Sequence, residues 1–396
     1  MASAALVALA ADEPEDDGVR TDEHVEKNVL RRLELCFRLS KSPTAMVWRV
    51  IEKRTRRIIC LKKCFDAFSN AATAQATYRE VMYLAALAGH DNIIRLQHVI
   101  RAEADQDLYL TFDYMQTDLH AVTRLGVLQP VHVKYVVYQL LKALKFVHSA
   151  GLVHRDVRPS NLLINADCHV KLADFGLARS LTLGVDLENP KLTEYVSTRW
   201  YRAIEILLGS MHYSQAVDMW SVGCVYAEML LGRPLFPGTS SLDQVVKILE
   251  LIGRPPEGDV ASVKSSYALT MIEMLPPLRP VSFAETFPTA GAEAMNLLQQ
   301  CLTFKANPGD RCSVGEALRH PYVAEFHDPG DEPSHAGTLV LPLDDFTLHE
   351  PHEYRNAIYD TIFKRKVEAR KRDKFANVNP KKVILTAHDE TLPEPF

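Results

Sequence analysis

Alternating apolar and polar positions mark the first regular elements of the chain. Between residues 33 and 39 single intervening residues separate the apolar ones, which is the period of a strand with one buried face. A second strand is expected to begin at Met46, and further strand-like runs cover 58–63 and 108–112. The alternating apolar residues of the first run are Leu33, Leu35, Phe37 and Leu39. This part of the chain is predicted to form a β-sheet.

Apolar residues at helical spacing dominate the later part of the chain. Between residues 133 and 147 they recur every three or four positions, which predicts an amphipathic helix. The stretch 217–225 is apolar almost all round, the pattern of a helix buried within a large lobe. A further helix is expected at 352–362, packed against the preceding domain. The chain therefore combines a β-rich first part with a helical second part.

Composition fits a large globular protein with two lobes. The chain has 396 residues and 47% hydrophobic content, enough for a sizeable core. Its 45 basic and 50 acidic residues give a net charge of −5, which argues against general affinity for nucleic acid. The seven cysteines lack paired Cys-x-x-Cys spacing, so neither a disulfide framework nor a zinc site is predicted. A reducing compartment is expected.

The first 30 residues are predicted to form a disordered acidic tail. The apolar run at their start lacks a basic n-region and leads into the acidic stretch 12–17, unlike a secretion signal. No apolar stretch reaches the length that spans a bilayer, so no transmembrane segment is expected.

Two short polar motifs carry the candidate chemistry. Residues 154–161 read His-Arg-Asp-Val-Arg-Pro-Ser-Asn, and residues 174–176 read Asp-Phe-Gly. Either motif alone is typical of a turn, because Asp and Gly favour turns. Together, with apolar strand-like runs at 162–164 and 170–172, they offer a carboxylate beside an attacking hydroxyl and two oxygen ligands for magnesium. The pair of motifs predicts phosphoryl transfer from a metal-bound nucleotide.

On these motifs the chain resembles the protein kinases, and specifically the MAP-kinase family. A closer similarity, to the atypical extracellular-signal-regulated branch called MAP kinase fifteen-like, rests on Phe112, on the run 62–68 and on the helix with Tyr354 and Arg355. The resemblance implies an α+β, bilobal fold. Its parts would be a tail at 1–30, a small, mainly β N-lobe at 31–115, a larger, mainly α C-lobe at 116–326, and a docking patch with a C-terminal extension at 327–396.

The resemblance also implies a site for ATP. Lys62 would hold the α and β phosphates, oriented by Glu80, and Phe112 would take the gatekeeper place beside the hinge. The other implied nucleotide contacts are Leu39, Ser40, Ser42, Ala45, Val47, Cys60, Asp113, Met115 and Leu163.

Catalytic roles follow from the same resemblance. Asp156 would accept or orient the substrate hydroxyl, while Asn161 and Asp174 would bind Mg²⁺. Arg158 stands where the family has a lysine, which keeps the charge but replaces a compact ammonium with a broad planar guanidinium.

The phosphate loop departs from the family pattern. Ser40, Ser42 and Ala45 replace its three glycines, and Pro43 removes a backbone donor at the expected hairpin tip. The sequence therefore predicts a weakened grip on the nucleotide.

A regulatory segment is implied before residue 205. Thr-Glu-Tyr at 193–195 matches the dual phosphorylation motif of extracellular-signal-regulated kinases, and Glu205 is expected to form a buried ion pair with Arg311. The implied phosphate ligands are Arg155 and Arg179 for Thr193, and Arg199 and Arg202 for Tyr195.

Partners are implied by an acidic stretch after the domain. Asp328, Asp331 and Glu332 resemble the family's docking patch for protein substrates and regulators with basic motifs, although an acidic turn exposed to solvent has the same composition. The basic run 364–374 predicts either a solvated helix face or a nuclear-import or anionic-surface segment. The resemblance implies a cytoplasmic monomer, with nucleus, cilium and basal body as further places of action.

Two functions compete at this point. One is an active, magnesium-dependent, proline-directed serine/threonine kinase regulated at Thr193 and Tyr195, with Arg202 shaping the proline subsite. The other is a pseudokinase scaffold with weak or no ATP binding, which the missing glycines favour. The enzyme is favoured by the retention of five residues: Lys62, Glu80, Asp156, Asn161 and Asp174.

Overall fold

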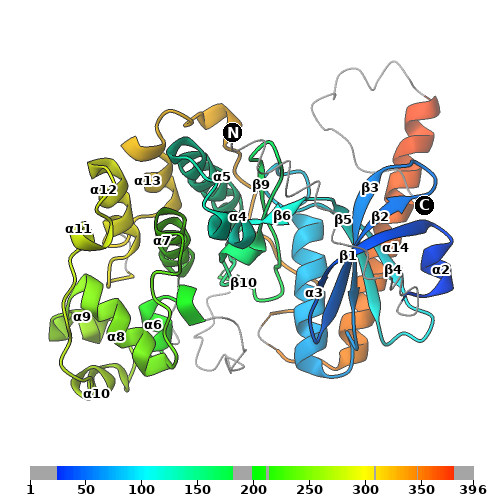
Figure 1. The fold of residues 1–396 in the computed structure, drawn as a ribbon. Helices are drawn as coiled ribbons and strands as arrows, with labels where there is room; N and C mark the ends of the chain where they lie inside the picture. Colours follow the sequence, from blue (N-terminus) through cyan, green and yellow to red (C-terminus); the bar gives the residue numbers. More distant parts are fainter. Residues whose placement is uncertain (1–24, 182–198, 211–213, 307–308, 346, 379–396) are drawn as a thin grey trace. The chain divides into compact units, whose positions relative to one another are not determined.

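The computed structural model describes residues 25–181, 199–210, 214–306, 309–345 and 347–378, drawn as a ribbon in Figure 1. These residues form two compact units. The small unit comprises the described residues of 13–89, 94–114 and 341–396, and the large unit comprises those of 90–93 and 115–340. The long segment of the large unit begins at Met115. The predicted C-terminal extension is divided between the two units, because its residues up to 340 belong to the large unit and those from Leu341 onward belong to the small unit.

The small unit is built on one antiparallel sheet of order β1-β2-β3-β5-β4. Its helices are α2, α3 and α14, of which α3 is capped by the side chain of Asn70. The strands are β1 (Leu33–Lys41), β2 (Ala45–Glu52), β3 (Ile58–Cys64), β4 (Leu96–Arg101) and β5 (Leu108–Asp113), and the helices are α2 (Lys27–Leu30), α3 (Ala71–Ala86) and α14 (Pro351–Val378).

Burial alternates along β2 but not along β1. Met46 and Trp48 are buried in the core, whereas Leu33 is the only buried residue of β1 and Leu39 is 36% exposed. β1 is the edge strand of the sheet and its register with β2 shifts twice, so its later side chains have no second neighbour to cover them. The strand was predicted correctly, but fewer of its alternating apolar residues are buried than the pattern predicted.

The segment just before β1 differs from the predicted disordered tail. Residues 27–30 form α2, and the side chains of Val25 and Val29 are buried in the core of the small unit. Because these valines cover apolar residues of the sheet, this part of the tail is ordered; residues 1–24 lie outside the described range.

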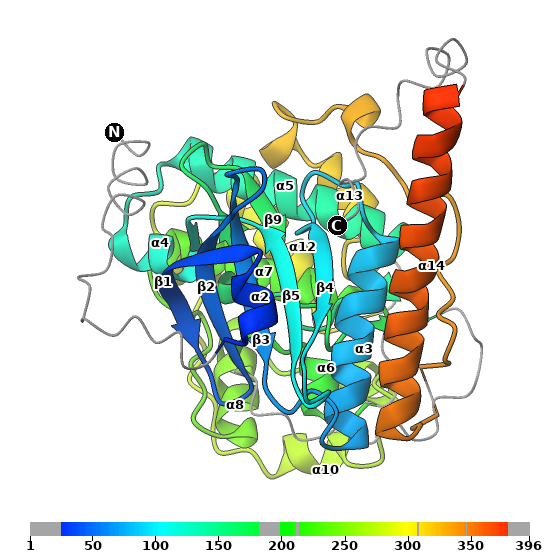
Figure 2. The same ribbon diagram turned by 90° about the vertical axis from the view of Figure 1, so that its right-hand side faces the viewer.

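Helix α14 lies alongside α3, as Figure 2 shows. The rings of Tyr78 and Tyr354 lie 5.3 Å apart, and the Tyr78 hydroxyl accepts a 3.0 Å hydrogen bond from the backbone N–H of Leu343. Arg79 donates to the buried carboxylate of Asp345 at 2.6 Å. The C-terminal segment is therefore an integral part of the small unit.

The large unit is mainly helical, and with the sheet of the small unit it confirms the predicted α+β kinase architecture. The predicted buried helices are present as α5 and α7. Its α-helices are α4 (Leu119–Leu125), α5 (Pro130–Ser149), α6 (Ile204–Leu207), α7 (Ala216–Leu231), α8 (Ser241–Ile252), α9 (Glu257–Ser262), α10 (Ala268–Glu273), α11 (Phe283–Thr286), α12 (Ala292–Cys301) and α13 (Val314–Leu318). Its short strands are β6 (Thr117–Asp118), β7 (Leu152–Val153), β8 (Leu162–Ile164), β9 (Val170–Leu172) and β10 (Arg179–Ser180). No helix in the described ranges is both long and apolar enough to cross a membrane.

Candidate active site

A buried carboxylate on α7 fixes the backbone of the predicted catalytic loop. Asp218 accepts hydrogen bonds from the backbone N–H groups of His154 at 2.9 Å and Arg155 at 2.8 Å, and its Oδ2 lies 2.9 Å from His148 Nε2. Burial alone would raise the pKa of Asp218, but these partners, His148 foremost, lower it overall. Arg155 has a positive φ of 68°, a strained conformation that this bracing holds. Asp218 was not predicted as a site residue from the sequence. The feature that could have indicated it is an acidic residue within an otherwise apolar helix.

His154 joins this loop to the Asp-Phe-Gly motif. Its ring meets Phe175 edge-on at 4.7 Å, and its Nε2 lies 3.1 Å from the carbonyl of Ala173. The other ring nitrogen accepts the backbone N–H of Asp156 at 3.3 Å. One imidazole therefore sets the spacing between the two motifs.

Asp156 lies in a position suited to a catalytic base. Burial raises its pKa, the neighbouring Asp174 adds to the rise, and the charge of Arg158 opposes it. The Nε of Arg158 lies 3.3 Å from Asp156 Oδ2. A carboxylate whose pKa lies above its usual range is a stronger proton acceptor than an exposed one.

Asn161 is held with its amide oxygen turned away from Asp156. Its Nδ2 donates to the backbone carbonyl and to Oδ2 of Asp156, both at 2.8 Å, so the amide oxygen is the atom that remains to bind a metal. Asp174 adopts a positive φ of 64° two residues after the end of β9. Magnesium usually keeps waters and substrate phosphates besides one or two protein oxygens, so this oxygen pair fits it. No group of three or more His, Cys, Asp or Glu that could hold a metal occurs among the described residues.

The ion pair predicted within the small unit is present. Lys62 on β3 donates to both carboxylate oxygens of Glu80 on α3, at 2.6 and 2.8 Å. Both side chains are largely buried, so the ammonium is held at one place on the sheet.

Several predicted nucleotide contacts share one face of the small unit's sheet. Val47 pairs with Lys62 across β2 and β3, and Cys60 pairs with Phe112 across β3 and β5. Burial raises the pKa of Cys60 to about 12, so its thiol is unreactive. The remaining predicted contacts are Asp113, whose carboxylate accepts from Arg95 and Gln97, and Met115 and Leu163, which belong to the large unit.

The hairpin in the place of the phosphate loop is closed by its own hydrogen bonds. The backbone N–H of Ser42 donates to the Ala45 carbonyl at 2.8 Å, and the Ala45 N–H donates to the Ser42 hydroxyl at 2.9 Å. Neither of these residues has a positive φ, and neither has Ser40. The tip is therefore an unstrained turn that offers few backbone donors to a nucleotide.

The predicted phosphate-binding arginines converge in pairs. Arg155 and Arg179 both donate to the carbonyl of Leu177, at 3.3 and 3.4 Å. Burial lowers the pKa of Arg202, and the nearby charge of Arg199 lowers it further. The two residues of the predicted switch, Thr193 and Tyr195, lie outside the described residues.

The predicted pair of Glu205 and Arg311 is present and buried. The guanidinium binds the carboxylate in a bidentate manner at 2.7 and 3.0 Å. This pair fixes the end of the segment that contains the switch.

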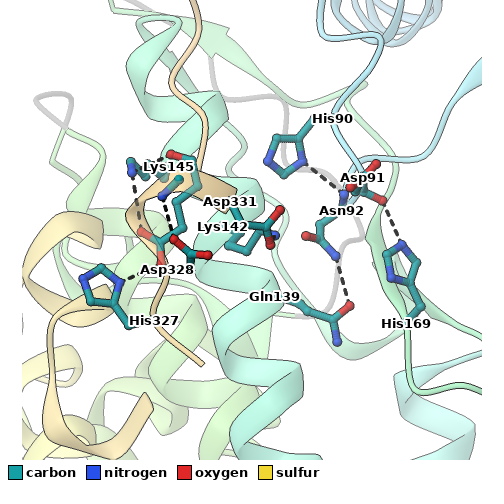
Figure 3. A network of polar contacts seen from close by, with 12 residues as sticks. His90, Asp91, Asn92, Gln139, Lys142, Lys145, His169, His327, Asp328 and Asp331 are labelled. Carbon is teal, nitrogen blue, oxygen red and sulfur yellow. Dashed lines mark hydrogen bonds and ion pairs between the residues drawn. The ribbon is translucent and has the colours of Figure 1, made fainter. Parts of the chain in front are cut away.

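The predicted docking acids are not equally exposed. Asp331 is exposed and pairs with Lys142 of α5 (Figure 3), and Asp328 is also exposed and caps the turn at Gly330.

Glu332 differs from the prediction. Its side chain is 1% exposed and bonds to His327 at 2.7 Å and to Lys145, so it is a buried structural acid and not a surface docking group. The sequence of this stretch alternates acids with turn residues, and it does not indicate which carboxylate faces the lysines of α5.

Comparison with known proteins agrees with these features. Residues 42–323 match the protein kinase domain family. The chain is 48% identical over 369 residues to extracellular signal-regulated kinase 2 of Dictyostelium discoideum. This alignment covers 93% of this chain and 98% of the Dictyostelium protein. It is 48% identical over 350 residues to mitogen-activated protein kinase 15 of Xenopus laevis, spanning 88% of this chain and 59% of the relative's length. The protein of that name from Caenorhabditis elegans is 43% identical over 349 residues, 86% of this chain and 73% of its own.

Proposed function

This chain belongs to the protein kinase family, in its mitogen-activated branch, and we propose that it transfers the γ-phosphoryl group of ATP to serine and threonine hydroxyls followed by proline. The observation that carries the proposal is the fixed constellation around Asp156. Its carboxylate is buried and bound by Asn161, whose remaining oxygen suits magnesium. A scaffold without chemistry has no need of this arrangement.

The residues of the site divide the reaction among them. Lys62, fixed by Glu80, would hold the α and β phosphates, and the substrate hydroxyl would lie beside Asp156. The hydroxyl oxygen forms a bond to the γ-phosphorus while the bond to the β-phosphate oxygen breaks, and the hydroxyl proton passes to Asp156. Magnesium, held by Asn161 and Asp174, would neutralise charge on the phosphates.

Regulation is proposed to act through the paired arginines. Phosphate on Thr193 would be bound by Arg155 and Arg179, whose guanidinium groups already share one carbonyl acceptor. Phosphate on Tyr195 would be bound by Arg199 with Arg202. Each would add charge-assisted hydrogen bonds to a segment that ends at the fixed residue Glu205.

The proposed partners are protein substrates and regulators with basic docking motifs. Asp331 and Asp328 are the exposed acids that support this proposal, and they lie on the same turn. We propose that the protein acts as a monomer in the cytoplasm, with cilium, basal body and nucleus as further places to examine with a tagged chain.

The test compares three full-length proteins: wild type, Asp156→Asn, and Asp167→Asn as a matched change at an exposed aspartate. The assay follows phosphate transfer from Mg-ATP to a protein substrate that contains Ser-Pro sequences. We expect Asp156→Asn to lower kcat by about a hundredfold or more, with Asp167→Asn close to wild type. Mass spectrometry of bacterially produced protein should find phosphate on Thr193 and Tyr195 in wild type and none in Asp156→Asn.

Wild-type turnover equal to that of Asp156→Asn, together with no measurable ATP binding, would reject the enzyme and favour the scaffold. Equal turnover of Ser-Pro and Ser-Ala substrates would reject the preference for proline.

A further inference from the structure

The chain contains one Ser-Pro sequence and no Thr-Pro, and that sequence lies in the phosphate-loop hairpin. Ser42 and Pro43 stand at the tip, directly after β1 ends at Lys41 and before β2 begins at Ala45. All three tip residues, 42–44, are exposed. The single site in the whole chain with the proposed substrate sequence is thus also accessible.

The Ser42 hydroxyl stabilises the hairpin tip. It accepts the Ala45 N–H at 2.9 Å and donates to the Ala45 carbonyl at 3.1 Å. The tip is also tied to the end of β3, because the Thr44 carbonyl accepts the Phe65 N–H at 2.9 Å. Modification of this hydroxyl would therefore act on the element that the family uses to cover nucleotide phosphates.

We propose that Ser42 is a phosphorylation site, modified by a second copy of this chain, and that phosphate there lowers the affinity for ATP. The proposal rests on the proposed function, because it requires a proline-directed kinase. In the transfer, Ser42 Oγ bonds to the γ-phosphorus of ATP bound to the other copy. The bond to the β-phosphate oxygen breaks, ADP leaves, and the hydroxyl proton passes to Asp156 of that copy.

Phosphate at this position opposes nucleotide binding in two ways. It removes the hydroxyl proton donated to the Ala45 carbonyl, which loosens the tip. It also adds nearly two negative charges to a tip in the same sheet as Lys62, the proposed phosphate ligand. Since the triphosphate is itself highly charged, we expect repulsion to raise the apparent Kd for ATP by about tenfold or more.

The experiment uses full-length wild type and Pro43→Ala, which keeps the Ser42 hydroxyl and removes the proline. Each protein is incubated with Mg-ATP, its Ser42 phosphate is quantified by mass spectrometry, and its ATP Kd is measured before and after incubation. We expect wild type to gain phosphate at Ser42 and to lose about tenfold in ATP affinity. Pro43→Ala should gain no phosphate there and keep its own starting affinity.

Two further arms identify the source. Asp156→Asn alone should remain unmodified at Ser42 and should become modified when mixed with tagged wild type. In a parallel arm an unrelated active proline-directed kinase phosphorylates Asp156→Asn, so that the effect on ATP binding is measured even if this chain lacks activity.

The outcomes separate this proposal from the proposed function. Turnover of a Ser-Pro protein substrate without modification of Ser42 would overturn the proposal and leave the enzyme standing. Phosphate at Ser42 with an unchanged ATP Kd would overturn the inhibitory role. Modification of Ser42 only by the unrelated kinase would overturn the assignment to a second copy.

Discussion

At the scale of single residues, burial and a neighbouring guanidinium act in opposite directions on Asp156. Burial raises the pKa of this carboxyl, and the charge of Arg158, 3.3 Å away, lowers it. The base must be deprotonated to accept a proton, so activity is present above its pKa and is lost as the pH falls through it. Arg158→Gln removes the lowering charge, and we expect the acid limb of the kcat/KM profile to move to higher pH by roughly half a unit to one unit.

Arg158→Lys is the matched control for this measurement. It keeps the positive charge, so its acid limb should stay near that of wild type even if kcat falls. An acid limb that does not move in Arg158→Gln would show that another group controls the profile.

The same scale shows where residue-level prediction succeeded. The family resemblance was sufficient for Lys62 with Glu80 and for Glu205 with Arg311, because both partners of each pair occupy fixed positions in the family's pattern. It was insufficient for Glu332, because burial depends on which lysines of α5 face the turn. Which side chains face one another depends on the tertiary structure, and a short stretch of sequence does not determine it.

At the scale of elements, the phosphate-loop hairpin is the feature that the structure reinterprets. Ser40, Ser42 and Ala45 replace the family's three glycines, which can adopt a positive φ without strain, yet none of the three has a positive φ here. Changing all three to glycine therefore relieves no strain, and it removes the hydrogen bonds of the Ser42 hydroxyl to the N–H and the carbonyl of Ala45. We expect the triple glycine protein to bind ATP no more tightly than wild type, and a titration with Mg-ATP measures this directly.

Ser40→Gly alone is the control, since the Ser42 turn is then intact. A triple variant with an ATP Kd roughly a hundredfold lower than that of wild type would show that the tip is strained after all, because each of three relieved positions contributes about 1 kcal/mol.

Elements with a long, regular pattern were predicted well. Helices α5 and α7 follow from apolar spacing, and β2 follows from alternation, because each pattern repeats over several turns or pairs. The short helix α2 was missed, since four residues give too few positions to reveal a period.

At the scale of the whole molecule, the small unit depends on a contact between residues far apart in the chain. The ion pair of Arg79 and Asp345 joins residues 266 positions apart, and both side chains are 4% exposed. Tyr83 donates a further hydrogen bond to the same carboxylate. Asp345→Asn leaves the buried guanidinium without its counter-charge, and we expect the free energy of unfolding of the small unit to fall by about 3 kcal/mol.

Thermal and urea unfolding check this expectation. Asp344→Asn is the matched control, because that side chain is 41% exposed, and it should cost about 1 kcal/mol or less. The double change Arg79→Met with Asp345→Leu should restore most of the loss, since it removes both buried charges. Equal stability of Asp345→Asn and Asp344→Asn would contradict a structural role for the pair.

The position of α14 against α3 also bears on how the protein is made. A ribosome releases α3 well before Asp345, which follows Arg79 by 266 positions, and before Tyr354, so the sheet-bearing unit cannot be completed until the intervening chain has been synthesised. Contacts of such long sequence separation fold slowly. During that interval the part of α3 around Tyr78 that Tyr354 later covers is exposed, and the nascent chain offers a surface for chaperones until the segment with Asp345 and Tyr354 has emerged.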